Sequence, residues 1–136
     1  MAALPVMAMA LMLALPALGQ TAALNGMDAV SLRDSGRVVG GRANIVTHWR
    51  GAVWHFTNEA NRQAFESNPR AYAPALGGFC AVAMAEGRKL KGDPAQFVIV
   101  DQRVFLTHDA AARARMQADP QGIAARAIAS WKRIGR

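Results

Sequence analysis

The stretch that decides the fold runs from Trp54 to Ala81 and reads WHFTNEANRQAFESNPRAYAPALGGFCA. It holds the only cysteine and the only tyrosine of the chain. An aromatic strand comes first, followed by a short helix that Thr57 or Asn58 caps. A Gly-Gly-aromatic-Cys turn comes next, where the glycines let the backbone turn sharply. It leads into a second helix, which we expect from Phe79 to Glu86.

Upstream, the stretch continues a predicted β-hairpin from Ile45 to Phe56. Arg50-Gly51 stands between two runs rich in β-branched and aromatic residues, which is typical of a hairpin turn. Side chains alternate between the faces of a strand, so Trp54 lies on the core side. The same alternation places His48 and His55 together on the other face, in diagonal positions.

Downstream, helices alternate with one more hairpin. Pro69 ends the first helix and opens a further single turn. The second hairpin is expected from Phe97 to Leu106, around Asp101-Gln102. Asp119-Pro120 then begins the last helix as N-cap and first helical residue. The pattern predicts an α+β fold: a small single domain of two β-hairpins packed with four or five short helices, without an internal repeat.

The chain divides into three predicted segments. Residues 1–19 carry no charged side chain and contain the apolar run Leu11–Leu15, which predicts a signal peptide cleaved near Gly19-Gln20. The run is too short to span a bilayer, so we expect no transmembrane segment in the mature chain. Residues 20–44 are predicted as an extended lead-in and residues 45–136 as the domain. The protein is therefore expected in the periplasm or secreted.

The net charge of +7 lies entirely after the predicted signal peptide. Residues 103–136 hold seven Arg or Lys against two Asp and so carry +5. A basic segment of this kind attracts acidic partners or anionic surfaces, or is simply a solvated helix face. Nucleic acid is not expected as a partner of an exported protein.

A set of residues in fixed order extends over nearly the whole predicted mature chain. Its members are Asn25-Gly26-Met27-Asp28-Ala29-Val30, Gly51, Trp54-His55-Phe56, Phe65, Pro69, Tyr72, Pro74, Gly77, Gly78, Cys80, Ala81, Gly92-Asp93-Pro94 and Phe105-Leu106. In order and spacing this set resembles the YHS domain, a small module associated with the handling of metal ions. The resemblance implies an exported, single-domain member of that family that binds a metal.

The chain departs from the metal-handling relatives at two ligand positions. Those relatives carry cysteines near the entry and near the start of the central helix. Here Ser31 stands near the first place and residues 58–61 around the second, none of them cysteine. A single cysteine excludes both an internal disulfide and a tetrahedral site built from several thiolates.

Cys80 is the first candidate for chemistry. A thiol near the amino end of a helix has its pKa lowered by the helix dipole, and thiolate is the form that binds soft metals. Met84 lies four residues on, so we expect both sulfur atoms on one helix face. Thiolate with thioether suits Cu(I). The alternative is structural, because free cysteine is among the most buried residue types.

The two histidines of the first hairpin complete the predicted ligand set. The metal ligands expected are Cys80, Met84, His48 and His55, for copper first and zinc second. A diagonal pair of strand residues lies about 7 Å apart at the backbone, which suits no simple chelate. The two histidines would need a third group to close a site, and otherwise are solvated strand residues. His108, at a strand–helix junction, is expected to make a local hydrogen bond.

Three classes of function follow. The leading hypothesis is weak or transient binding of a metal ion, copper. The alternative is an interaction module in which Cys80 is structural and the basic helices meet a protein partner of acidic character or an anionic surface. A thiol enzyme using Cys80 with His48 or His55 is a third class. We expect no enzyme, because the sequence shows no nucleophile elbow, phosphate loop or zinc-protease helix.

Overall fold

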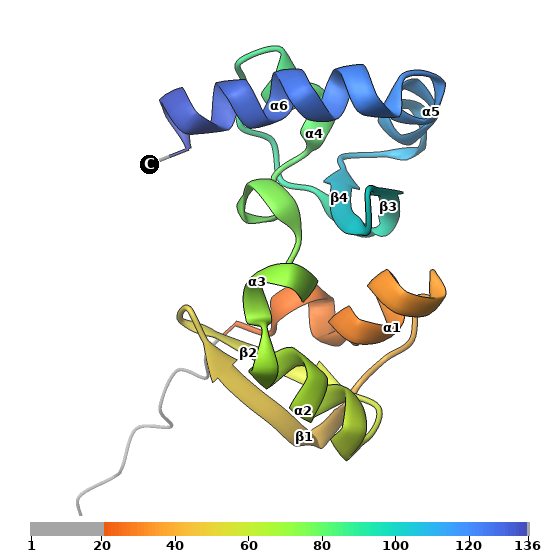
Figure 1. The fold of residues 1–136 in the computed structure, drawn as a ribbon, viewed down its shortest axis with the longest axis vertical. Helices are drawn as coiled ribbons and strands as arrows, with labels where there is room; N and C mark the ends of the chain where they lie inside the picture. Colours follow the sequence, from red (N-terminus) through yellow and green to blue (C-terminus); the bar gives the residue numbers. More distant parts are fainter. Residues whose placement is uncertain (1–20, 136) are drawn as a thin grey trace, which may run out of the picture.

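The computed structural model describes residues 21–135, and within them the chain forms two antiparallel hairpins, six α-helices and two 3-10 helices (Figure 1). The elements are, in chain order, η1 (Ala23–Gly26), α1 (Ala29–Ser35), β1 (Arg42–Trp49), β2 (Ala52–Phe56), α2 (Glu59–Ser67), α3 (Pro69–Tyr72), η2 (Ala75–Gly78), α4 (Ala81–Ala85), β3 (Asp93–Val100), β4 (Arg103–Thr107), α5 (Ala110–Ala118) and α6 (Pro120–Ile134). The predicted α+β class is confirmed, with one helix more than expected. The predicted signal peptide lies outside the described residues.

Both hairpins turn at the predicted residues. The turn between β1 and β2 is Arg50-Gly51, and that between β3 and β4 is Asp101-Gln102. All four residues have φ angles between 50° and 73°. Two-residue loops with positive φ match the right-handed twist of the flanking strands, so each turn fixes the register of its hairpin.

The prediction that residues 20–44 form an extended lead-in is wrong for residues 21–44, which the structure describes. This segment forms η1 and α1, and Val30 and Leu32 of α1 are buried. Asp28 begins the helix, because its side chain accepts hydrogen bonds from the N–H groups of Val30 and Ser31. A helix of two turns is too short to show the apolar periodicity on which the prediction depended.

The order of elements occurs twice. A 3-10 helix, an α-helix, a hairpin and two helices make up the first half, residues 21–74, and the same series makes up the second half, residues 75–135. Three pairs of equivalent elements have equal lengths: β1 and β3 have eight residues each, β2 and β4 five, and α2 and α5 nine. The prediction that the chain has no internal repeat is therefore wrong.

Equivalent backbone contacts hold the two halves in the same shape. The N–H of Asp28 donates to the carbonyl of Val39 at 2.8 Å, and the N–H of Cys80 donates to the carbonyl of Leu90 at 2.7 Å. Each hairpin also carries its register irregularity near the start of its long strand. The repeat therefore extends to individual hydrogen bonds, beyond the order of elements.

The sequence of the repeat is clearest at the start of each half. Ala23-Leu24-Asn25-Gly26 corresponds to Ala75-Leu76-Gly77-Gly78, and each is followed two residues later by an Ala-Val pair. In both segments the last three residues have positive φ. Asn and Gly adopt this backbone most readily, and the leucine in each is buried, which holds it there.

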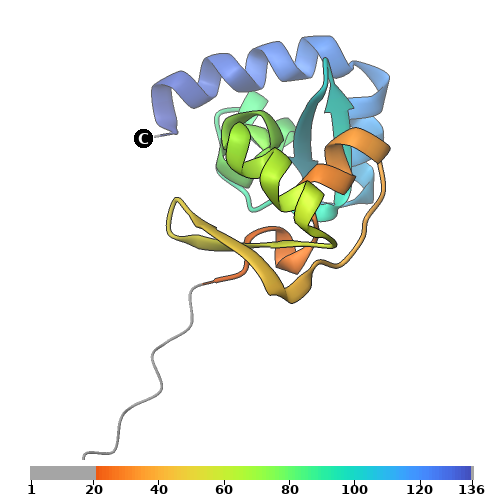
Figure 2. The same ribbon diagram turned by 60° about the horizontal axis from the view of Figure 1, so that its bottom comes forward.

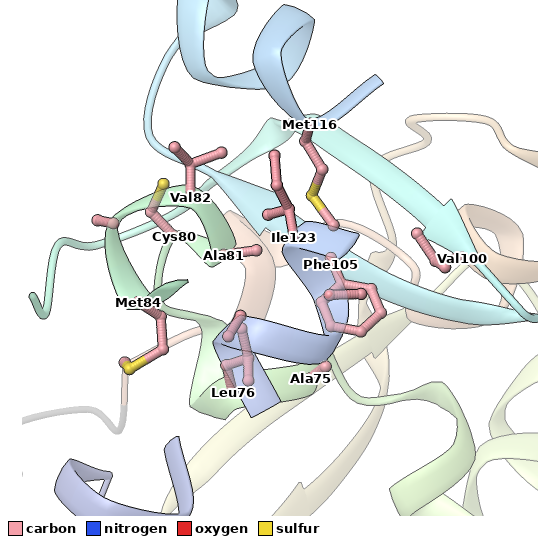
Figure 3. Close-up of a cluster of buried hydrophobic side chains, with 13 residues drawn as sticks. Ala75, Leu76, Cys80, Ala81, Val82, Met84, Val100, Phe105, Met116 and Ile123 are labelled. Carbon is pink, nitrogen blue, oxygen red and sulfur yellow. The ribbon is translucent and has the colours of Figure 1, made fainter. Parts of the chain in front are cut away.

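Two hydrophobic clusters form the interior. The first core contains Leu24, Ala29, Val30, Leu32, Trp54, Phe56, Phe65, Ala73, Val104 and Leu106. The second core, drawn in Figure 3, contains Ala75, Leu76, Cys80, Ala81, Val82, Ala83, Met84, Val100, Phe105, Met116, Ile123, Ala124 and Ala127. Each core belongs mainly to one half, so each half buries its own apolar side chains.

The second hairpin joins the two cores. Val104 and Leu106 on one face of β4 belong to the first core, whereas Phe105 on the opposite face belongs to the second. Strand residues alternate between faces, so one strand supplies both clusters. Because the two halves share this hairpin, they form one folded unit.

Helix α6 closes the second core. It has 15 residues where its counterpart α3 has four. Ala127 is buried in the second core, and Ile128, Trp131 and Ile134 pack against it. The end of α6 thus covers the second half, as the β3–β4 hairpin covers the first. Both views place the β1–β2 hairpin and α6 at opposite ends of the molecule (Figures 1 and 2). Among the described residues, no helix has the length and apolarity that a membrane span requires.

Candidate functional site

Cys80 lies near the amino end of a helix, as predicted, but it is buried. It precedes α4, its side chain makes no capping hydrogen bond, and its exposed fraction is 1%. It belongs to the second core, among aliphatic and aromatic side chains. The sulfur is therefore surrounded by protein and not by solvent.

Met84 is fully buried in the same core, with an exposed fraction of 0%. Figure 3 shows the sulfur atoms of Cys80 and Met84 pointing in different directions from the backbone of α4. The expectation that both sulfurs project from one helix face is therefore wrong. The reason is that Cys80 is the N-cap and lies outside the regular helix, where the four-residue spacing no longer applies.

The two histidines lie on the predicted face of the first hairpin. His48 pairs with Val53 and His55 with Val46, so the two rings are diagonal neighbours on the side away from the core. Nδ1 of His55 lies 3.3 Å from the carbonyl oxygen of Arg42. Nδ1 of His108 lies 3.2 Å from the carbonyl oxygen of Lys91, 17 residues away along the chain, so its contact is with another segment and not a local one.

The structure does not bring the four predicted ligands together. The histidines belong to the first hairpin, whereas Met84 belongs to α4 and Cys80 precedes it, in the half that contains α6 (Figure 1). Within residues 21–135, no three His, Cys, Asp or Glu side chains are grouped closely enough to hold a metal ion. Copper or zinc binding at these residues stays a prediction.

Asp28 is a buried polar centre that the sequence did not reveal. Its exposed fraction is 0%. One carboxylate oxygen accepts from the N–H groups of Val30 and Ser31, and the other accepts from the N–H and hydroxyl of Thr57 and from the amide of Asn61, all within 3.1 Å. Burial alone would raise the pKa of Asp28, but these hydrogen bonds together hold it below its ordinary value. Asp28 therefore ties α1 to the hairpin and to α2.

A cleft of about 1310 Å³ is lined by residues of both halves. Its walls come from η1, the β1–β2 turn and α3 of the first half, and from η2, the β3–β4 turn and α6 of the second. Figure 2 shows the β1–β2 turn and the carboxyl end of α6 on the same side of the molecule. Because the duplicated halves meet here, each contributes equivalent elements to the cleft.

The charge of the cleft lining is strongly positive. Its ionisable side chains are five basic residues, Arg33, Arg50, Arg70, Lys91 and Arg103, and one acidic residue, Asp101. Arg33 forms an ion pair with Asp34. The ion pairs of residues 21–135 include none of the other four basic residues, all of which are exposed. The cleft therefore presents four cations that lack a carboxylate partner within that range.

Aromatic side chains accompany these cations. All three tryptophans of the chain, Trp49, Trp54 and Trp131, line the cleft. The guanidinium of Arg50 lies 4.5 Å from the ring centre of Trp49. A cation over an aromatic face is attracted by the ring quadrupole, which orders the charge while leaving its donors free.

Sequence reasoning missed most of this site. Of the five basic residues, only Arg103 belongs to the basic carboxy-terminal segment that the sequence singled out. The others are single residues in a turn, two helices and a loop, far apart along the chain. No local signal marks them, because they do not occupy equivalent positions in the two halves: Arg50 corresponds to Asp101, and Arg103 corresponds to Ala52.

The chain matches no protein-family model, no curated protein and no solved structure. Its resemblance to YHS-domain proteins and the export expected from residues 1–19 stay predictions.

Proposed function

We propose that this protein is an interaction module that binds an acidic partner in the cleft between its two halves. The observation that carries the proposal is the charge of the lining, five basic side chains against one acidic. Clefts lined by one sign of charge focus the electrostatic field and raise the local concentration of oppositely charged ligands. The role is that of a binding module, with Cys80 as part of the core.

The kind of cation supports an acidic partner. Four of the five basic residues are arginines, and a planar guanidinium can make two parallel hydrogen bonds to one carboxylate. Arg50, Arg70 and Arg103 are exposed and can reach a ligand. A charged group that is buried and paired inside a protein has lost its water and uses its donors on its partner. The guanidinium groups of these three arginines are exposed, so their donors are available to a ligand.

The location differs from the sequence-based expectation of basic carboxy-terminal helices. Lys132 and Arg133 of α6 do not line the cleft, whereas Arg33, Arg50 and Arg70 of the first half do. This difference between basic residues inside and outside the cleft provides a matched pair of variants. Arg50→Glu/Arg103→Glu and Lys132→Glu/Arg133→Glu change the net charge of the protein equally, but only the first pair alters the cleft.

The test titrates poly-L-glutamate into the predicted mature protein and follows tryptophan fluorescence, because all three tryptophans line the cleft. We expect Arg50→Glu/Arg103→Glu to weaken binding about tenfold or more and the control pair to weaken it less than about threefold. Circular dichroism checks that both variants fold. Equal losses in the two variants, or no binding by the parent protein, would overturn the proposal.

A further inference from the structure

We infer that the partner presents an acidic peptide segment in extended conformation, which lies along the cleft and contacts both halves at once. This inference rests on the proposed function and adds the class of ligand and its mode of binding. It follows from the size of the cleft, the mixture of side chains that line it, and the distribution of its cations.

The size of the cleft favours an extended segment. Pockets for small molecules have volumes of about 300–1,000 Å³, and this cleft, at about 1310 Å³, is larger. It is also concave, whereas a lipid bilayer presents its phosphates on a nearly flat surface. A chain segment can enter the concave cleft, whereas a flat bilayer surface would contact only the rim of the cleft.

The lining also contains aromatic and amide side chains that suit a peptide. Trp49, Phe79 and Trp131 offer partly buried aromatic surface for side chains. The exposed side chains of Asn68 and Gln102 carry both amide donors and carbonyl acceptors, which match the N–H and C=O groups of an extended backbone. Peptide recognition commonly combines main-chain hydrogen bonds with pockets for alternate side chains.

The unpaired cations are divided between the halves. Arg50 and Arg70 belong to the first half, and Lys91 and Arg103 belong to the second. A ligand that contacts only one half can meet two of these four charges. A longer acidic segment can meet all four, and the second contact then adds affinity because it is intramolecular. Affinity should therefore depend on the length of the ligand.

The experiment measures the affinity of the predicted mature protein for oligoglutamates of about two, four, eight and twelve residues, since an extended chain gains about 3.3–3.6 Å per residue. Tryptophan fluorescence and calorimetry report binding at low and moderate salt. We expect affinity to rise about tenfold or more between the shortest and the longest peptides and then to level off.

Variants of each half test whether the gain comes from spanning the cleft. Arg50→Ser/Arg70→Ser and Lys91→Ser/Arg103→Ser should each remove most of the gain with length and reduce binding of the shortest peptides only about twofold. Lys132→Ser/Arg133→Ser is the control, since it removes two charges outside the cleft and should keep the length dependence.

Each other outcome has a defined meaning. Equal affinity at every length would overturn the spanning mode and leave a site for a small carboxylate. Tighter binding to phosphatidylglycerol vesicles than to the longest peptide, lost in the cleft variants, would overturn the peptide and assign an anionic lipid surface. If the dependence on length survives both in Arg50→Ser/Arg70→Ser and in Lys91→Ser/Arg103→Ser, the proposal that the peptide spans the cleft is also overturned. If no oligoglutamate or poly-L-glutamate binds, the proposed function fails as well.

Discussion

Asp28 and Cys80 occupy the same position in the two halves of the molecule. Each is the N-cap of the helix that follows a 3-10 helix, and each donates its N–H to a backbone carbonyl ahead of a hairpin, at 2.8 and 2.7 Å. Asp28 holds five side-chain hydrogen bonds, whereas the Cys80 side chain makes no capping bond and packs in an apolar core. One backbone frame is thus stabilised by a polar centre in one half and by apolar packing in the other.

We expect Asp28→Ala to lower the free energy of unfolding by about 3 kcal/mol, since it removes a helix cap and leaves buried donors without an acceptor. Chemical denaturation measures the change. Asp109→Ala is the matched control: Asp109 is an exposed N-cap that accepts one backbone hydrogen bond, so its loss should cost about 1 kcal/mol. Equal losses in the two variants would show that the buried hydrogen bonds of Asp28 add little.

The pH dependence of stability follows from the same carboxylate. The pKa of Asp28 is lower in the folded protein than the 3.8 of an ordinary aspartate, so folding favours the ionised form. Its contribution is therefore fully present above about 3.8 and is lost as the pH falls through the folded pKa. We expect denaturation midpoints to fall below pH 4 by more in the parent than in Asp28→Asn, which does not titrate.

Glu86 must be separated from this effect, because hydrogen bonds from Arg88 and Arg115 also lower its pKa. These contacts are exposed, and salt screens them. Repeating the acid series in Glu86→Gln and at high salt removes the contribution of Glu86. A parent and an Asp28→Asn variant that lose stability equally between pH 4 and pH 2 would contradict the assignment to Asp28.

Local patterns predicted most of the elements of this fold. Turn residues fixed both hairpins, and Asp119-Pro120 fixed the start of α6. The repeat was not recognised in the sequence because equivalent positions of the two halves lie in different surroundings and carry different residues. His48 and His55 of the first hairpin correspond to Ile99 and Leu106 of the second. Leu106 is buried in the first core and must be apolar, whereas its counterpart His55 lies on the side of the first hairpin away from the core. Ile99, the counterpart of His48, is exposed and belongs to neither core, so packing does not explain that difference.

The functional residues were harder to predict for a related reason. Sequence reasoning chose Cys80 and Met84 for their chemistry, but both are core residues in the structure. The basic lining of the cleft depends on how the two halves meet, and no local spacing encodes that. Arg50 appeared in the sequence only as a turn residue, although it lies at the edge of the cleft.

The accessibility of Cys80 decides between the copper hypothesis and a structural thiol. With an exposed fraction of 1%, we expect Cys80 to react with a thiol reagent only as the protein unfolds, in step with loss of circular dichroism. Fast labelling of the folded protein, blocked by Cu(I), would favour the metal hypothesis. Titrating Cu(I) and Zn(II) into the parent and into Cys80→Ser then tests the ligand directly: binding that the variant loses would assign copper to this sulfur.

The outer face of the first hairpin offers a test of whether its two histidines keep the protein from self-associating. On the second hairpin the equivalent face is apolar, and Val104 and Leu106 there are buried against the first half. An apolar face that is exposed to water favours association with another protein surface. We expect His48→Ile/His55→Leu, which copies the second hairpin, to make the protein self-associate with rising concentration, as measured by sedimentation velocity. Ala60→Leu/Ala114→Leu is the control, since it adds leucines at exposed helix positions, and it should stay at the parent's size. A double variant that sediments as the parent does would show that the two histidines do not keep this face from associating.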